Sequence, residues 1–141
     1  MDPSFDALPD GGTELAALLE RSGVDHRREG DRFSFLFAGG GCRWQTVCDC
    51  QDQLVLVYGV HPVPVTAPQR AAELCSELNA RVVHGSFFLQ EGHIVFRTCA
   101  HLVEHVDAQE RVALAIEYNA AAIVRFWERL SAGAGGSGVL K

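Results

Sequence analysis

The sequence predicts an α+β domain in which an antiparallel sheet packs with three helices, in the order α-β-β-β-α-β-β-α. Apolar and polar residues alternate in several short segments, which is typical of strands that bury one face. Short polar connections join these segments within each group, and such connections favour antiparallel hairpins. Three further segments carry apolar residues at helical spacing after capping residues, which indicates helices.

Length and charge restrict the class of protein. A chain of 141 residues fits a single domain, and its formal net charge of -6 argues against nucleic acid, because phosphate binding needs a basic patch. The basic cluster at residues 26–28 is flanked by acidic side chains and is typical of a solvated turn or edge strand. Every apolar run falls short of the roughly 20 residues that cross a bilayer, so we expect no membrane partner.

The cysteines and the ends of the chain indicate where the protein works and where its domain lies. Five cysteines, an odd number, and an acidic N-terminus unlike a signal peptide predict a reduced, cytoplasmic protein. Residues 1–12 contain Pro and Gly and are expected to be a loose tail. A single domain is expected at 13–131, and residues 132–141, rich in Gly and Ser, are expected to be disordered.

The first half of the chain predicts one helix and three strands. Thr13 can cap a helix that runs to about residue 22. A strand with alternating phenylalanines follows at 32–37, and glycines at 39–41 predict the turn to a second strand that carries Trp44 and three more inward-facing residues. The third strand, at 54–58, is apolar at every position, so we expect it to be covered on both faces.

The second half predicts a helix, a strand pair and a closing helix. A capping box at Thr66 predicts the second helix, which ends near Asn79, a residue type that tolerates the left-handed conformation. Strands follow at 81–89 and 93–100, and a capping signature at Asp107 predicts the last helix, to about residue 130. The inner stripe of the second helix would consist of Ala71, Leu74, Cys75 and Leu78.

Cysteines and histidines are the candidates for metal binding or catalysis. Cys48 and Cys50 share one face of a strand, which Cys42 could share, and His61 could add a ligand. Zinc sites, however, pair their cysteines in tight turns, so we expect buried apolar cysteines and neither a metal nor another cofactor. A nucleophilic role for Cys48 or Cys99 lacks any local signature, and no catalytic residue is assigned.

Two further motifs are interpreted as structural. His101 and His105 have the spacing of helical metal ligands, but they lie where a loop is expected. The glycines at 39–41 lack the Lys and Ser or Thr of a phosphate-binding loop, and a strand follows them where such a loop needs a helix. Both segments are therefore predicted to be surface turns.

The segment 78–89, Leu-Asn-Ala-Arg-Val-Val-His-Gly-Ser-Phe-Phe-Leu, resembles the YbjN family, as do residues 92–97 and the closing helix. In that family a helix ends in Leu-Asn, two strands follow across a short turn, and a long helix closes the domain. The resemblance covers about residues 13–131, although the proline-containing stretch 60–65 and the glycine turn have no match in it. It implies the fold of type III secretion chaperones, a bacterial regulatory or stress role, and no catalytic residues.

We therefore expect a non-enzymatic protein-binding module with an unidentified protein partner, which either holds an extended client segment or docks onto a folded partner. We also expect a homodimer, because consecutive apolar residues in the strands exceed what three helices can cover. By analogy with the chaperones, the contact residues would be Ala71, Leu74, Cys75 and Leu78. The alternative is a metal-dependent or thiol-based sensor or enzyme that uses Cys42, Cys48, Cys50 and a histidine.

Overall fold

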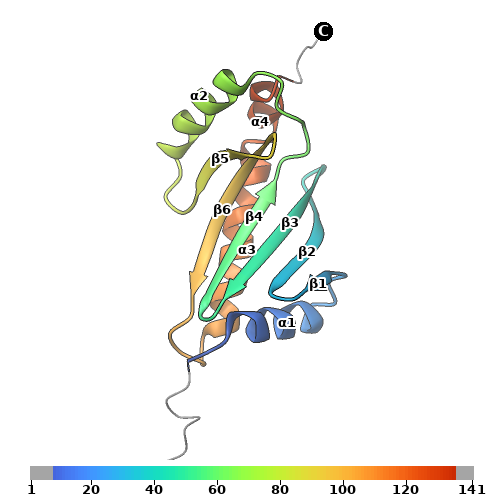
Figure 1. Ribbon diagram of the computed structural model, residues 1–141, viewed down its shortest axis with the longest axis vertical. Helices are drawn as coiled ribbons and strands as arrows, with labels where there is room; N and C mark the ends of the chain where they lie inside the picture. Colours follow the sequence, from blue (N-terminus) through green and yellow to red (C-terminus); the bar gives the residue numbers. More distant parts are fainter. Residues whose placement is uncertain (1–7, 136–141) are drawn as a thin grey trace, which may run out of the picture.

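The computed structural model describes residues 8–135, which form one antiparallel sheet with its helices on a single face. The strands lie in the order β1-β2-β3-β4-β6-β5 (Figure 1). In chain order the elements are α1 (Gly11–Arg21), β1 (Arg27–Glu29), β2 (Arg32–Gly39), β3 (Cys42–Gln51), β4 (Leu54–Val60), α2 (Pro68–Asn79), β5 (Ser86–Gln90), β6 (His93–His101), α3 (Ala108–Arg125) and α4 (Trp127–Gly133).

This architecture confirms the predicted α+β fold and the order of its main elements. At the basic cluster, residues 27–29 form a fully exposed edge strand, β1, beside β2, which is one of the two structures expected there. One feature was not predicted. The closing helix breaks at Phe126, whose φ of -105° separates α3 from α4.

The inner face of the sheet carries two core clusters along the length of α3. One lies under α1 and the first half of α3, where Phe33, Cys48 and Val55 are fully or almost fully buried. The other lies under α2 and α4, where Trp44 and Phe96 are its large side chains. The helix α3 passes behind the sheet from one cluster to the other (Figure 1), so it joins the two halves of the domain.

Side-chain hydrogen bonds fix α3 against the sheet. The amide of Asn119, which is buried, donates to the carbonyl oxygens of Val57 at 3.0 Å and Phe96 at 2.8 Å. The hydroxyl of Thr98 donates to the carbonyl oxygen of Ala115 at 2.6 Å. Because buried polar groups are costly to leave without partners, these bonds set both the height and the rotation of the helix.

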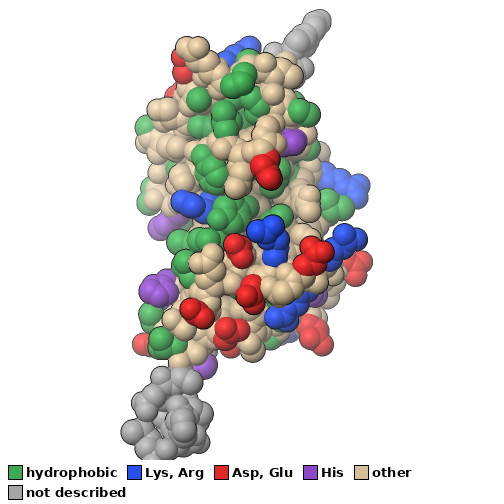
Figure 2. All heavy atoms as spheres, viewed as in Figure 1, with side chains coloured by type: hydrophobic (Ala, Val, Ile, Leu, Met, Phe, Trp, Pro, Cys, Tyr) green, Lys and Arg blue, Asp and Glu red, His purple; other side chains and the backbone are tan. Residues whose placement is uncertain are grey.

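The expectation that β4 is covered on both faces is wrong. The described helices all pack on the inner face, and Leu54, Leu56 and Tyr58 on the outer face are half-buried by neighbouring strands alone. Figure 2 shows this outer face, where hydrophobic side chains gather over the upper part and charged side chains over the lower part. An apolar run in a strand did not distinguish cover by a helix from cover by adjacent side chains.

The first helix begins earlier than the sequence indicated. Its N-cap is Asp10, whose carboxylate accepts from the backbone N–H of Thr13 at 2.9 Å, so Thr13 is not the cap. Gly11 and Gly12, which were expected in the tail, are buried in the first turn. A Cβ on Gly11 would lie 2.9 Å from Cγ2 of Val55, so glycine permits the helix to start against the turn between β3 and β4.

The start of α2 and the end of the chain also differ from expectation. Ala67 is the N-cap of α2, without a side-chain hydrogen bond, and Pro68 occupies the first turn. The backbone N–H and the hydroxyl of Thr66 donate instead to the carbonyl oxygen of Ala134, at 2.8 Å and 3.2 Å. Residues 132–135 are thus packed onto the domain, whereas 136–141, like residues 1–7 of the expected N-terminal tail, lie outside the described residues.

Candidate functional site

The sheet has an open edge at the end of β6. Strand β5 pairs with β6 over His93–Arg97, whereas β4 pairs with it over Val95–His101. Within the described residues, positions 98–101 of β6 therefore have a neighbouring strand on one side only. The carbonyl oxygen of Ile94 faces the β4 side, where it accepts from His61 N–H at 2.9 Å, so the backbone groups of odd-numbered residues face the open side.

The short length of β5 produces this open edge. The sequence predicted a strand from residue 81, but β5 begins at Ser86. The side chain of Asn79 donates to the carbonyl oxygen of Phe87 at 3.0 Å and accepts from its N–H at 2.6 Å, which fixes where the strand starts. Gly85, with a φ of 86°, turns the chain away from β6, and a Cβ there would lie 2.6 Å from the carbonyl oxygen of Arg97.

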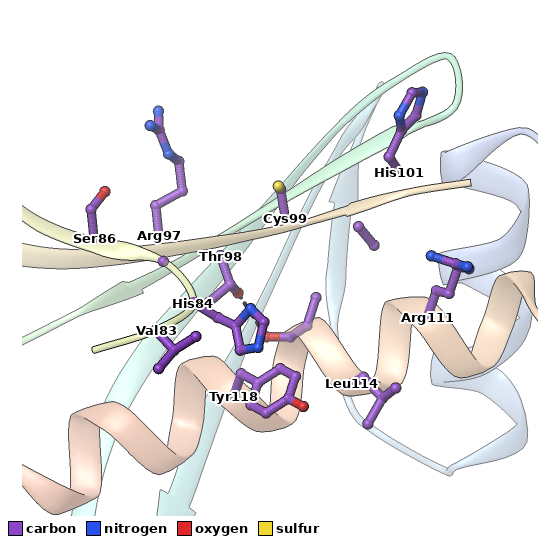
Figure 3. Close-up of a pocket in the computed structure, with 13 residues that line it drawn as sticks. Val83, His84, Ser86, Arg97, Thr98, Cys99, His101, Arg111, Leu114 and Tyr118 are labelled. Atoms are coloured by element: carbon purple, nitrogen blue, oxygen red, sulfur yellow. Dashed lines mark hydrogen bonds between the residues drawn. The ribbon is translucent and has the colours of Figure 1, made fainter. Parts of the chain in front are cut away.

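A groove of about 430 Å³ lies along the open edge, between β6, the loop before β5 and helix α3. Figure 3 shows Arg97 and Cys99 pointing away from α3, and Leu114 and Tyr118 rising from α3 on the other side of the strand. Val83, from the loop, is 90% exposed, and Leu114 and Tyr118 are 42% and 47% exposed. Exposed apolar side chains that gather in one place can mark an interaction surface, and these three line the same groove, so the groove is the candidate functional site.

The groove is positively charged in a chain of net negative charge. Its charged side chains are those of Arg97 and Arg111, and no described lining residue is a carboxylate. Asp107, which does not line the groove, accepts from Nε of Arg111 at 2.8 Å. Arg97 carries no such ion pair among the contacts of the described residues, and its guanidinium lies 5.5 Å from the Phe88 ring. The site is therefore suited to an anionic group.

The sequence had not singled out Arg97, Arg111, His84 or Tyr118. The ring of His84 stacks on that of Tyr118 with centroids 4.7 Å apart, which brings the loop onto α3. These residues are far apart in the sequence and share no motif. Only the absence of large apolar residues at positions 97, 99 and 101, on the outer side of β6, hinted that this end of the strand is solvated.

The predicted contact residues of the second helix lie elsewhere. Ala71, Leu74, Cys75 and Leu78 are all buried in the cluster beneath α2, against residues of β5, α3 and α4. A second copy could reach these side chains only if α2 left its own core. The homodimer stays a prediction, and light scattering would test it, since one chain has a mass of 15.3 kDa.

The cysteines of the alternative hypothesis are in the core. Cys48 and Cys50 lie on the inner face of β3, and Cys42 lies at the other end of the same strand. Burial is the main cause that raises the pKa of Cys48 far above its usual value and that of Cys50 to about 11. Cys48 and Cys50 are therefore protonated thiols, which are poor nucleophiles. In the part of the chain that the structure describes, no three His, Cys, Asp or Glu side chains gather as metal ligands would.

His61 is fully buried and has a structural role. Its Nδ1 accepts from Val63 N–H at 3.4 Å, so the proton of the neutral ring is on Nε2, 3.2 Å from Oγ of Ser131. The Ser131 hydroxyl in turn donates to the carbonyl oxygen of Trp127 at 3.1 Å. His61 therefore donates to the serine and does not accept its proton, which is the opposite of what a serine nucleophile needs.

The remaining predicted positions are structural or peripheral. Glycines 39–41 form the hairpin turn between β2 and β3, as expected. His101 ends β6 and lines the groove, while His105 lies in the following loop. Within residues 8–135, no helix combines the length and apolar character needed to cross a membrane.

The order of the strands and the packing of the described helices on one face of the sheet define a small α+β domain. The model of the YbjN family, described as "Putative bacterial sensory transduction regulator", matches residues 12–128. The chain therefore belongs to the YbjN family. The crystal structure of YbjN from E. coli, "a putative transcription regulator", has 16% sequence identity and a TM-score of 0.58, covering 83% of this chain and 91% of that one, and so shares the fold. No curated protein matches the chain.

Proposed function

We propose that this chain is a non-enzymatic regulatory module that binds a protein partner by holding an extended segment of it along the open edge of β6. The single observation that carries the proposal is that residues 98–101 are paired on one side only, next to a groove with exposed apolar side chains. An extended peptide can add to such an edge as one more strand, with backbone hydrogen bonds that supply affinity.

The sequence led us to expect either of two kinds of protein binding. The open edge of β6 favours the chaperone-like kind, in which an extended client segment is held. A thiol-based activity of Cys48 or Cys50 is less favoured, because burial raises the pKa of both thiols. The formal net charge of -6 disfavours direct contact with nucleic acid. Five free thiols fit a reducing compartment, and we place the protein in the cytoplasm.

Replacing Cys99 by proline is expected to abolish partner binding while the domain stays folded. Proline removes the N–H that faces the open edge, and edge positions with an outward N–H tolerate proline. Loss of one backbone hydrogen bond and of regular pairing should weaken binding by at least about tenfold. Full-length protein would be immobilised and exposed to a lysate of its native host, and the captured proteins would be quantified by mass spectrometry.

Cys99→Ser is the matched control, because it keeps the backbone N–H and should retain the same partners. Thermal unfolding followed by circular dichroism would confirm that both variants are folded. A set of partners captured equally by wild type and by Cys99→Pro would show that the edge of β6 is not the binding surface.

A further inference from the structure

We propose that the segment held at the open edge is acidic on one side and apolar on the other, with the two kinds of residue alternating. This inference rests on the proposed function and specifies the chemistry of the partner. Residues directly opposite in neighbouring strands point to the same face of a sheet, and successive residues point to opposite faces. The side chains on either side of β6 therefore determine what each alternate residue of an added strand meets.

The outer face of this edge offers positive charge. Residues of an added strand opposite Cys99 and His101 would point to the same face as these side chains and as Arg97 (Figure 3). Arg97 is exposed, and its guanidinium lies over the Phe88 ring, 5.5 Å from the ring centroid. A carboxylate on the added strand can approach it and form a charge-assisted hydrogen bond. Acidic residues are therefore favoured at these positions.

The inner side of this edge is lined by apolar side chains of α3. Residues opposite Thr98 and Ala100 would point toward α3, where Leu114 and Tyr118 are about half exposed. Burying these two side chains under an apolar residue removes their surface from water, at roughly 25 cal/mol per Å². Aliphatic or aromatic residues are therefore favoured at the alternate positions.

The same charges disfavour a second copy of this chain at this edge. Two copies paired edge to edge would bring two of these grooves together, each with Arg97 and Arg111 and no lining carboxylate, and like charges brought close across strands are destabilising. The edge therefore suits a partner of opposite charge, and an acidic, alternating segment of another protein is the occupant that the groove fits.

The test uses fluorescein-labelled peptides of about six residues, long enough to span the open edge, with alternating Asp and Leu. One comparison peptide has Lys in place of Asp, and the other has the same residues as an Asp block followed by a Leu block. Fluorescence anisotropy with the full-length protein should show the alternating acidic peptide binding at least about tenfold more tightly than either. Cys99→Pro should remove this binding.

Arg97→Gln should lower the affinity for the alternating acidic peptide by about fivefold to tenfold. Arg43→Gln is its matched control, because Arg43 is also exposed on the outer face but lies on β3, away from the groove, and affinity should not change. Equal binding of the lysine or block peptide would overturn the inference, and so would binding that survives Cys99→Pro.

The results separate this inference from the function on which it rests. Host proteins lost from Cys99→Pro, together with no binding of the acidic peptide, would overturn the acidic pattern and leave partner binding at the edge intact. Host proteins retained by Cys99→Pro would overturn both. A wild type that is dimeric and a Cys99→Pro variant that is monomeric in light scattering would identify a second copy as the occupant, which also overturns the inference.

Discussion

Gly59→Ala is expected to lower the free energy of unfolding by about 3 kcal/mol and the melting temperature by about 10 °C. Gly59 lies in β4 directly beneath α3, and a Cβ there would lie 2.3 Å from Oδ1 of Asn119 and 3.2 Å from Cγ1 of Ile123. Asn119 cannot move aside freely, because its amide donates to two strand carbonyls. Chemical denaturation monitored by circular dichroism would measure the loss.

Gly39→Ala is the control for this substitution. Gly39 ends β2, and an added Cβ would meet no heavy atom within 4 Å, so a change of less than about 0.5 kcal/mol is expected. In the double variant Gly59→Ala with Asn119→Ala, the combined loss should be smaller than the sum of the two single losses, because the two atoms that collide are no longer both present. Equal losses of unfolding free energy for Gly59→Ala and Gly39→Ala would contradict the close approach of Asn119 to Gly59.

Protonation of His61 should by itself lower the free energy of unfolding by about 3 kcal/mol as the pH drops from above 6.5 to about 4. Burial, and secondarily the charge of His93, lowers the pKa of His61 from 6.5 to about 4. The unfolded chain takes up a proton near pH 6.5, whereas the folded chain resists it until about pH 4. Stability from the neutral ring is thus complete above pH 6.5 and is lost progressively as the pH falls toward 4.

Urea denaturation of the wild type and of His61→Gln at neutral pH and at about pH 4.5 would measure this contribution. Carboxylates also titrate in this range, so the difference between the two proteins is the quantity that isolates His61. His26→Gln is the control, since His26 is exposed, and it should follow the wild type. A pH dependence that is the same in His61→Gln and wild type would show that the buried ring does not govern acid sensitivity.

Much of the fold could be predicted because its signals are local. The alternating residues of β2 and β3, the glycine turn between them and the apolar stripe of α2 each lie within a few positions of one another. The features that were missed depend on tertiary contacts. Asp10 caps α1 because Gly11 packs against the turn before β4, which no local pattern shows.

The candidate site could not be predicted for the same reason. Val82 and Val83 are residues that favour strands, but the start of β5 is decided by the bonds of Asn79 to Phe87 and by the positive φ of Gly85. The groove then combines a loop, a strand edge and a helix whose residues are distant in the sequence. The apolar stripe of α2 could be predicted, but periodicity alone could not show whether the stripe faces the core of the same chain or a second chain.

The bond from Thr98 to Ala115 has a consequence for the energetics of recognition. It joins residues 98–101 of β6, which lack a neighbouring strand on one side, to the part of α3 that carries Leu114 and Tyr118. The strand edge and the helix are therefore held at a set spacing before any ligand binds. The groove is thus preorganised, and the conformational entropy lost on association is mostly that of the peptide. Constraining that peptide in an extended form, for example by cyclisation, should therefore raise its affinity.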